Sequence, residues 1–351
     1  MQSPWPVDDI VALTRMRGLT SADIIALVRT CGTIDEALDR IGRTIGLPLG
    51  LDDTDVPPVD TSADSTIVTY FCDTYPARLR AIPHPPIVLD VRGRLPPDDV
   101  PAIAVVGTRA ATAQYGRPVT ESLVRAWVEA GCCIVSGLAN GIDTLAHEAT
   151  IAMSGITAAV IACGIDRITP AHAKRLAERI VDGGGCIVSE YARGQAALPP
   201  YFPQRNRIIS GLGDAVVIVE SKRTGGALIT AEFARQHHRP LYAVPGPVTS
   251  QRSAGCNALL ASGHARTLCD ARQLLEDLGI DRLPGLGARP RPELSGIERR
   301  LIDTIGNGMT YVDDIARETA LSVDTVLQTL LDLEFRGFVR RLPGQRFVAM
   351  E

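Results

Sequence analysis

The chain has 351 residues, of which 45% are hydrophobic and 22% are charged, so it holds enough apolar matter for two or three domain cores and is not a wholly disordered chain. Its formal net charge of −4 excludes a uniformly basic nucleic-acid-coating protein and limits polyanion binding to a local patch. Lys174 and Lys222 are the two lysines among the 36 basic residues, and the others are arginines. The planar guanidinium group of arginine can form two parallel hydrogen bonds to one phosphate.

The cysteines and the N-terminal residues bear on location and cofactors. The eight cysteines include no C-x-x-C pair and the six histidines are scattered, so we expect no metal site and no cofactor. Residues 1–9 lack a basic region followed by an apolar run, and no apolar run reaches the roughly 18 residues of a membrane span. We therefore expect a soluble cytoplasmic protein with reduced thiols and no membrane span.

The first part of the chain predicts a small helical domain over residues 1–47. Apolar residues recur at helical spacing between residues 8 and 46, and Arg17-Gly18-Leu19-Thr20 is typical of a turn, with Thr20 or Ser21 capping the next helix. This pattern resembles a sterile-alpha-motif or helix-hairpin-helix module. Two interpretations stay open here: simple helical packing, or a phosphate contact at a helix N-terminus.

A long central region follows an acidic, proline-rich linker predicted at 48–66. Over residues 67–280, continuous apolar runs alternate with helical patterns, which is typical of parallel strands buried on both faces. The predicted strands are 102–106, 132–136, 157–162, 186–189, 215–219 and 241–244, and the clearest helices are 118–130, 143–153 and 171–182. The pattern predicts an α/β fold with an extended Rossmann-like, doubly wound sheet.

The last part of the chain predicts a winged-helix domain over residues 295–351, after a Pro/Gly/Arg-rich linker at 281–294. Helical patterns near 296–305, 311–319 and 323–336 precede two short strand patterns, 338–342 and 346–349, with Pro343-Gly344 as the turn between them. Ser322 is in place to cap the third helix.

Two common nucleotide-binding motifs are absent from the sequence. No G-x-G-x-x-G follows the first parallel strand, and neither lysine lies in a Walker A loop, so an NAD enzyme or a P-loop ATPase is not expected.

Instead, glycine-containing loops follow the strands: Gly107-Thr108-Arg109, then 136–143 with Gly137 and Gly141. Because parallel strands end at one edge of the sheet, we expect these loops to form an anion site, although a plain tight turn is the alternative.

A basic segment adds a second kind of contact. Phe202-Pro-Gln-Arg205-Asn206-Arg207 places an aromatic ring beside two arginines, a pattern in which cations hold phosphates and rings stack on bases. Lys222 precedes Gly225 and Gly226 after a further strand, and residues 191–252 carry eight positive side chains against three acids, a net of +5. A solvated helix start is the alternative interpretation of the first segment.

Taken together, these stretches resemble the DNA-processing protein A family (DprA, also called Smf). The resemblance covers about residues 70–270 and is carried by Tyr75-Pro-Ala-Arg-Leu79, Val106-Gly-Thr-Arg109, residues 136–147, residues 202–209, Thr224-Gly-Gly-Ala-Leu-Ile-Thr230, Val244-Pro-Gly246 and Gly255-Cys-Asn257, in order. One departure is Thr169-Pro170 with Ala173, where the family pattern has a Tyr-Pro followed by an Asn.

The resemblance implies a single-stranded DNA-binding protein without nucleotide hydrolysis. It implies a homodimer that protects incoming DNA and loads RecA recombinase during natural transformation and recombination. Carried over to this chain, it gives phosphate contacts to Arg109, Arg205 and Arg207, with Lys222 added from its charge, and base stacking to Phe202. The cradle around the strand would be formed by Gly107, Thr108, Gly137, Gly141, Asn206, Gly225 and Gly226.

Two rival functions remain at this point. Residues 224–232 are similar to the catalytic loop of cytokinin-type phosphoribohydrolases, with Glu232 at the place of a catalytic carboxylate, although Thr224, Leu228 and Ile229 depart from that motif. The other rival is a transcription regulator acting through the winged helix. Its third helix carries acids rather than the cations of a major-groove reader, which favours a protein contact or DNA contact through the wing alone.

Overall fold

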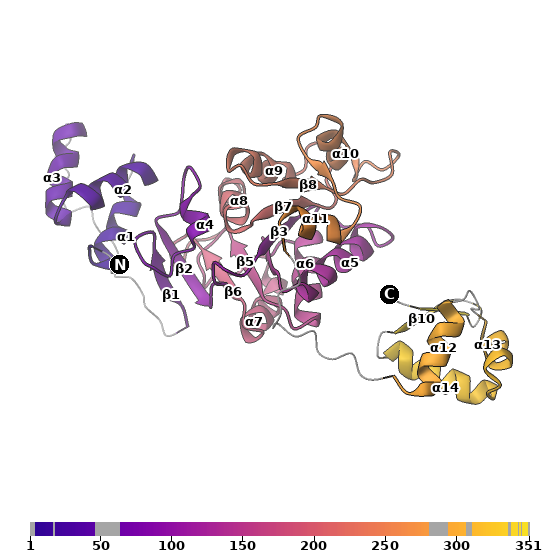
Figure 1. Cartoon of the computed structure of the whole chain (residues 1–351). Coiled ribbons are helices and arrows are strands. Elements are labelled where there is room, and N and C mark those ends of the chain that lie inside the picture. The colour runs from indigo at the N-terminus through magenta and orange to yellow at the C-terminus, as the bar shows by residue number, and fades with distance from the viewer. Residues whose placement is uncertain are drawn as a thin grey trace. The chain divides into compact units, whose positions relative to one another are not determined.

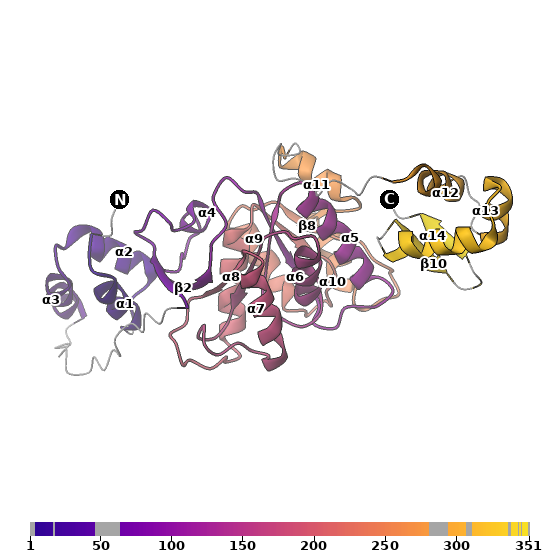
Figure 2. The ribbon, with the colours of Figure 1, turned by 90° about the horizontal axis from the view of Figure 1, so that it is seen from below.

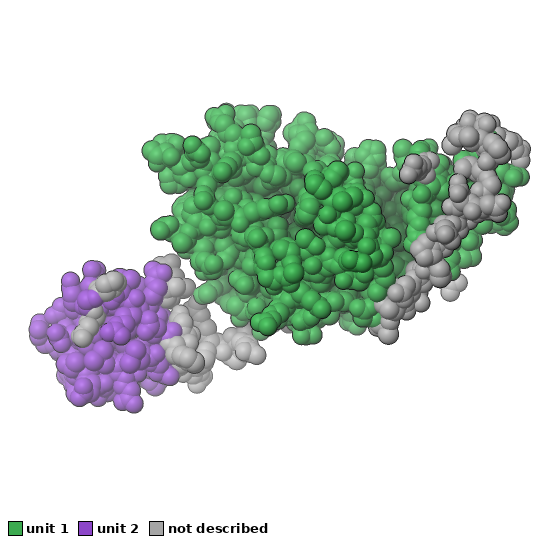
Figure 3. Space-filling view, turned by 180° about the vertical axis from the view of Figure 1, so that it is seen from behind, with its two compact units in different colours: residues 1–284 green, residues 285–351 purple. Residues whose placement is uncertain are grey.

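A computed structural model describes residues 4–16, 18–45, 64–280, 294–306, 311–335, 338–342, 344 and 346–349. The chain divides into two compact units, Met1–Pro284 and Gly285–Glu351 (Figure 3). Most of the two predicted linkers, 48–66 and 281–294, and Pro343 of the predicted wing turn lie outside the described residues.

Three helices open the first unit: α1 (Val7–Arg15), α2 (Ser21–Thr30) and α3 (Ile34–Ile45). Thr20 caps α2, as predicted: its hydroxyl accepts the Asp23 N–H at 3.2 Å, and the Asp23 carboxylate accepts the Thr20 N–H at 2.9 Å. The apolar sides of these helices share a buried cluster with Ile87, beside the first strands of the sheet. This segment therefore falls within the first unit rather than forming a compact unit of its own.

A nine-stranded sheet forms the centre of the described part of the first unit (Figure 1). Its strands are β1 (Thr66–Thr69), β2 (Val88–Gly93), β3 (Ala102–Val106), β4 (Cys133–Ser136), β5 (Thr157–Ile161), β6 (Cys186–Ser189), β7 (Ala215–Ile218), β8 (Leu241–Ala243) and β9 (Arg266–Thr267). The order is β1-β2-β6-β5-β4-β3-β7-β8-β9, and all pairs from β6 to β9 are parallel. The six predicted strands are confirmed, and β1 and β2 add an antiparallel edge that the sequence did not indicate.

Helices cover both faces of this sheet. They are α4 (Ala77–Arg80), α5 (Gly116–Glu129), α6 (Ile142–Ala152), α7 (Lys174–Asp182), α8 (Tyr201–Leu212), α9 (Ala227–Gln236), α10 (Ala254–Ala261) and α11 (Ala271–Asp277), with the 3-10 turn η2 (Ala171–Ala173) before α7. α8 and α9 pack on one face of the sheet, and α5, α6, α7 and α11 pack on the other (Figures 1 and 2). The doubly wound Rossmann-like architecture is therefore confirmed.

The chain reverses its direction of travel across the sheet between β3 and β7. From β3 the chain adds β4, β5 and β6 on one side, and it then returns to place β7 and β8 on the other side of β3. In open α/β sheets, ligands bind outside the carboxyl ends of the strands at such a switch point. The loops that follow β3 and β7 are therefore the part of the fold best placed to hold a ligand.

The second unit has the winged-helix order of elements that the sequence predicts. It contains α12 (Gly296–Gly306), α13 (Val312–Thr319), α14 (Val323–Phe335), β10 (Val339–Leu342) and β11 (Arg346–Ala349). The two strands pair antiparallel, and Leu301, Ile315, Leu330 and Phe347 are fully buried between the helices and the wing. Ser322 caps α14 by accepting the Thr325 N–H at 3.2 Å.

Candidate nucleic-acid interface

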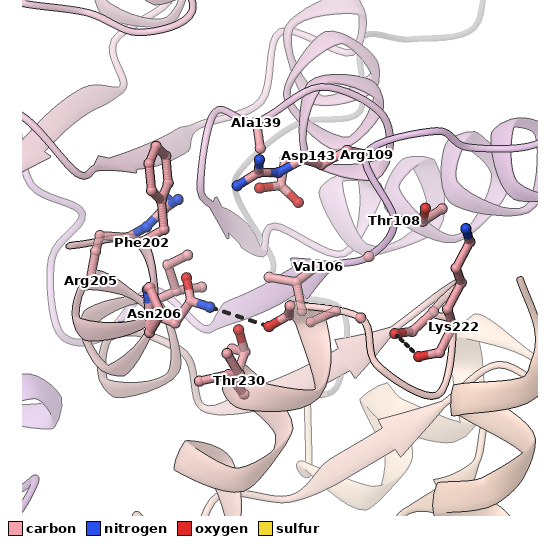
Figure 4. A pocket seen from close by; sticks show the side chains of 18 of the residues that line it. Val106, Thr108, Arg109, Ala139, Asp143, Phe202, Arg205, Asn206, Lys222 and Thr230 are labelled. Atoms are coloured by element: carbon pink, nitrogen blue, oxygen red, sulfur yellow. Dashed lines mark hydrogen bonds between the residues drawn. The ribbon is translucent and has the colours of Figure 1, made fainter. Parts of the chain in front are cut away.

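A pocket of about 570 Å³ lies at the carboxyl ends of β3 and β7. It is lined by residues from the loops after β3, β4 and β7, from the first turns of α6 and α9, and from α8 (Figure 4). Nine predicted site residues line it: Gly107, Thr108, Arg109, Phe202, Arg205, Asn206, Lys222, Gly225 and Gly226. Arg207, Gly137 and Gly141 are not among the lining residues.

Backbone hydrogen bonds join the loop after β3 to the loops after β4 and β7. The Ile142 N–H donates to the Thr108 carbonyl at 3.2 Å, and the Thr108 N–H donates to the Glu220 carbonyl at 2.7 Å. A Cβ on Gly107 would collide with the Ile142 side chain. Gly141 has a φ of +81°, and a Cβ there would collide with the Thr108 carbonyl oxygen. These glycines therefore allow close backbone approach, and the Thr108 amide is already used inside the protein.

Arg109 and Phe202 form the exposed wall of the pocket. The Arg109 guanidinium carbon lies 5.1 Å from the centroid of the Phe202 ring, within the range of a cation–π contact. Arg109 is exposed and Phe202 is half-buried at the start of α8. This pairing places a positive charge and an aromatic face together at the mouth of the pocket (Figure 4).

Arg205 lines the pocket from beneath its surface rather than from the wall. Its side chain is 4% exposed, and its Nη1 donates to the Val160 carbonyl of β5. A Cβ on Gly137 would collide with this guanidinium, so the glycine leaves room for the arginine. Burial lowers the pKa of Arg205. Arg205 therefore has internal contacts, whereas an arginine that binds a DNA phosphate would face the solvent.

Asp143 is a pocket residue that the sequence reasoning did not select. It lies in the first turn of α6, is 6% exposed, and accepts the Gly137 N–H at 3.2 Å. Burial raises the pKa of Asp143 to about 6, although the charge of Arg205 opposes the rise. The sequence signal for Asp143 is an acid in the first turn of a helix that follows a glycine-containing loop, a position where a carboxylate can accept backbone N–H groups.

The loop after β7 forms the opposite part of the lining. Lys222 is exposed there, and the Asn206 side-chain amide donates to the Gly226 carbonyl at 3.4 Å (Figure 4). A Cβ on Gly225 would collide with the Ser221 hydroxyl, whereas nothing lies within 4 Å of a Cβ on Gly226. Gly225 is therefore sterically required in the cradle, but Gly226 is not.

Arg207 faces away from the pocket on α8. Its guanidinium forms an ion pair with Glu190, and its side chain is 17% exposed. Residues 205 and 207 are two positions apart on a helix, so their side chains project about 200° apart around its axis. The helical phase thus separates the two arginines that the sequence placed together.

The candidate catalytic carboxylate of the rival enzymatic function lies outside the pocket. Glu232 lies on the exposed side of α9, where it pairs with Arg235 at 2.8 Å, and it does not line the pocket. Among the described residues, no three His, Cys, Asp or Glu side chains are grouped to hold a metal ion. No helix in the described ranges is long and apolar enough to cross a membrane.

The structure defines a Rossmann-like protein with a pocket at the switch point of its sheet and a separate winged-helix unit. The family model for DNA recombination-mediator protein A matches residues 66–279, and the model for the DprA winged helix domain matches residues 287–345. The chain belongs to the DNA-processing protein A family, DprA or Smf.

Individual relatives agree with this assignment. Protein Smf of Synechocystis is 35% identical over 310 residues, covering 78% of this chain and 77% of the relative. The X-ray structure of DNA processing protein A from Streptococcus pneumoniae matches with a TM-score of 0.59 and 31% identity, covering 77% of this chain and 92% of that one. A structure of the Helicobacter pylori protein, described for its single-stranded DNA binding mode, matches with a TM-score of 0.55 and 27% identity, covering 62% of this chain and 98% of that one.

Proposed function

We propose that the pocket at the ends of β3 and β7 binds single-stranded DNA. The observation that carries the proposal is the Arg109–Phe202 contact at the mouth of a pocket on the switch point of the sheet. A cation beside an aromatic face suits a phosphate next to an unstacked base, which single strands offer and duplexes do not. The single-stranded DNA binding of the Helicobacter pylori relative supports the proposal.

In this proposal the basic residues have different roles. Arg109 and Lys222, both exposed, contact phosphates, and Phe202 stacks on a base. Arg205, which donates to the Val160 carbonyl of β5 and lies against Gly137, positions the loop after β4, and Arg207 stays paired with Glu190. The roles of Arg205 and Arg207 thus differ from the phosphate contacts that the family resemblance implied.

The proposal extends to the biological role of the family. The chain acts as a cytoplasmic homodimer that protects incoming single strands and loads RecA recombinase in natural transformation and recombination. Membership of a recombination-mediator family supports this role. Sedimentation equilibrium tests the dimer, and the rate of RecA filament nucleation on single-stranded DNA, with and without the protein, tests the loading.

The protein is proposed to act without catalysis. Glu232, the candidate carboxylate of a phosphoribohydrolase, lies outside the pocket and is paired with Arg235. We therefore expect the purified protein to leave AMP intact. Release of ribose 5-phosphate that is lost on Glu232→Gln would instead support the hydrolase function.

A salt-titrated comparison of single-stranded and duplex DNA binding tests the central proposal. Each phosphate contact on a single strand contributes a slope of about −0.7 to the dependence of log affinity on log salt. We expect Arg109→Gln and Lys222→Gln together to reduce the slope by about 1.4. Arg117→Gln is the matched control, because Arg117 is an exposed arginine on α5 that pairs with Glu121. Equal affinity for both DNA forms, or an unchanged slope, would remove the pocket from the proposed function.

A further inference from the structure

The third helix of the winged-helix unit has an apolar stripe at its surface. α14 places Val323, Leu327 and Leu331 four residues apart, which aligns side chains along one side of a helix. Val323 is 41% exposed and Leu331 is 49% exposed, whereas Leu327 between them packs partly against the core of the unit. The two exposed side chains are about 12 Å apart along the helix axis, so the stripe spans just over two turns.

The charges on α14 have one sign. The helix carries three acids, Asp324, Asp332 and Glu334, and no Lys, Arg or His. Glu334 accepts the Arg341 N–H at 2.9 Å, so this carboxylate has a contact within the unit. Asp324 lies in the first turn, next to Val323, and is exposed. The acids of such a helix repel the phosphates that flank a major groove of DNA. Winged-helix proteins that recognise bases in this groove place cations and amides there.

We propose that the stripe of Val323, Leu327 and Leu331 is a docking surface for a protein segment. The segment would be amphipathic, with apolar side chains that cover the stripe and Lys or Arg beside them. An amphipathic helix binds to such a surface through apolar side chains that recur at helical spacing along one of its sides. The acids of α14 and the absence of cations on it favour a basic partner, because complementary charges steer association and fix orientation.

The test uses the full chain and a defined probe. The probe is a fluorescent 18-residue peptide of Leu and Lys in amphipathic helical order, followed by anisotropy. Val323→Ser with Leu331→Ser should weaken its binding at least tenfold. Ile297→Ser is the matched control, because it removes an apolar side chain of 44% exposure from α12, and it should leave the affinity unchanged. Asp324→Asn should weaken binding about threefold and reduce its salt dependence.

Several outcomes would overturn the proposal. Equal affinity of the double variant and the wild type, or equal binding of a peptide with Glu in place of Lys, would show that α14 does not select this partner. A drop in duplex DNA affinity in the double variant would identify α14 as a DNA reader. A changed oligomeric state in sedimentation would identify a second copy as the occupant. Circular dichroism melting separates these results from a folding defect, and the single Asp324→Asn variant keeps the test informative if the double variant unfolds.

Discussion

The guanidinium carbon of Arg109 lies 5.1 Å from the centroid of the Phe202 ring, although 92 residues separate the two positions along the chain. Arg109 follows β3 and Phe202 lies in the first turn of α8, so the fold brings two unconnected segments to one mouth of the pocket. Each side chain limits the freedom of the other. A strand that binds there meets a pre-positioned cation and ring, which lowers the entropic cost of ordering them.

Phe202→Ala should lower the affinity for single-stranded DNA without changing its salt dependence. Loss of one base-stacking contact costs roughly 1–3 kcal/mol, and no charge is removed. Anisotropy titrations at several salt concentrations measure both quantities. Phe233→Ala is the control, because Phe233 of α9 stacks on His237 and does not line the pocket. If Phe202→Ala unfolds the unit but leaves the affinity of the folded fraction unchanged, Phe202 is a packing residue and not a stacking platform.

Arg109→Gln should lower both the affinity and the salt slope. Glutamine lacks the guanidinium charge, so the substitution removes one phosphate contact, worth about 0.7 in slope. The loss should be similar for all base compositions, because phosphate contacts carry no sequence information. Selective loss for one homopolymer, with the slope intact, would argue that Arg109 reads bases.

Arg205→Ala should destabilise the first unit. The substitution leaves the Val160 carbonyl without its donor and Asp143 without the nearest opposing charge, which together cost on the order of 3 kcal/mol. The phosphate contact that the family resemblance implies for Arg205 predicts a reduced salt slope instead, so the two roles of this residue lead to different outcomes. Urea unfolding measures the stability, and Arg205→Lys should recover part of it. A stable Arg205→Ala protein with a reduced slope would restore the direct phosphate contact.

The sequence was most informative where one physical signal dominates. Continuous apolar runs such as Ala102–Val106 gave the inner strands, because a strand buried on both faces has no polar side to alternate with. The rule that ligands bind at strand carboxyl ends then predicts that Arg109 and Lys222 share one site. β1 is a four-residue edge strand and β2 lies between it and β6, and both were missed because polar residues such as Thr66, Asp90 and Arg92 interrupt their apolar runs.

The orientation of α8 could not be obtained in the same way. Phe202, Arg205 and Arg207 are close in sequence, but the helix start at Tyr201 sets which of them faces the sheet. Arg205 is four residues before Ile209 and shares its buried side, while Arg207 is directed to Glu190. A segment this rich in polar residues has too weak an apolar period to fix the phase, so the burial of Arg205 becomes visible only in the folded chain.

Gly137→Ala and Gly226→Ala form a matched pair that separates steric need from sequence similarity. A Cβ at Gly137 would collide with the Arg205 guanidinium and the Asp143 carboxylate, so we expect a loss of about 1–3 kcal/mol in the free energy of unfolding. A Cβ at Gly226 meets nothing within 4 Å, and its substitution should change stability by less than about 1 kcal/mol. Equal effects of the two substitutions in urea unfolding would contradict the close packing described for the loop after β4.

Asp143 should make both stability and DNA binding depend on pH. Burial raises the pKa of Asp143 to about 6, above its ordinary value of 3.8, so the folded state holds this proton more tightly than the unfolded state does. The contribution of Asp143 to the free energy of unfolding should therefore fall by roughly 3 kcal/mol as pH rises from about 4 to 6. Burial lowers the pKa of His147 to about 3, so this imidazole is neutral in the folded state, and its protonation in the unfolded state below its ordinary pKa of 6.5 opposes the Asp143 contribution. The difference between the wild type and Asp143→Asn isolates the contribution of Asp143. Ionised Asp143 also opposes a phosphate in the pocket, so affinity for single-stranded DNA should rise as pH falls through 6. Asp143→Asn should bind more tightly at pH 7 and lose this dependence, whereas Glu232→Gln, on the exposed side of α9, should keep it. A pH profile of Asp143→Asn that matches the wild type would place the titrating group elsewhere.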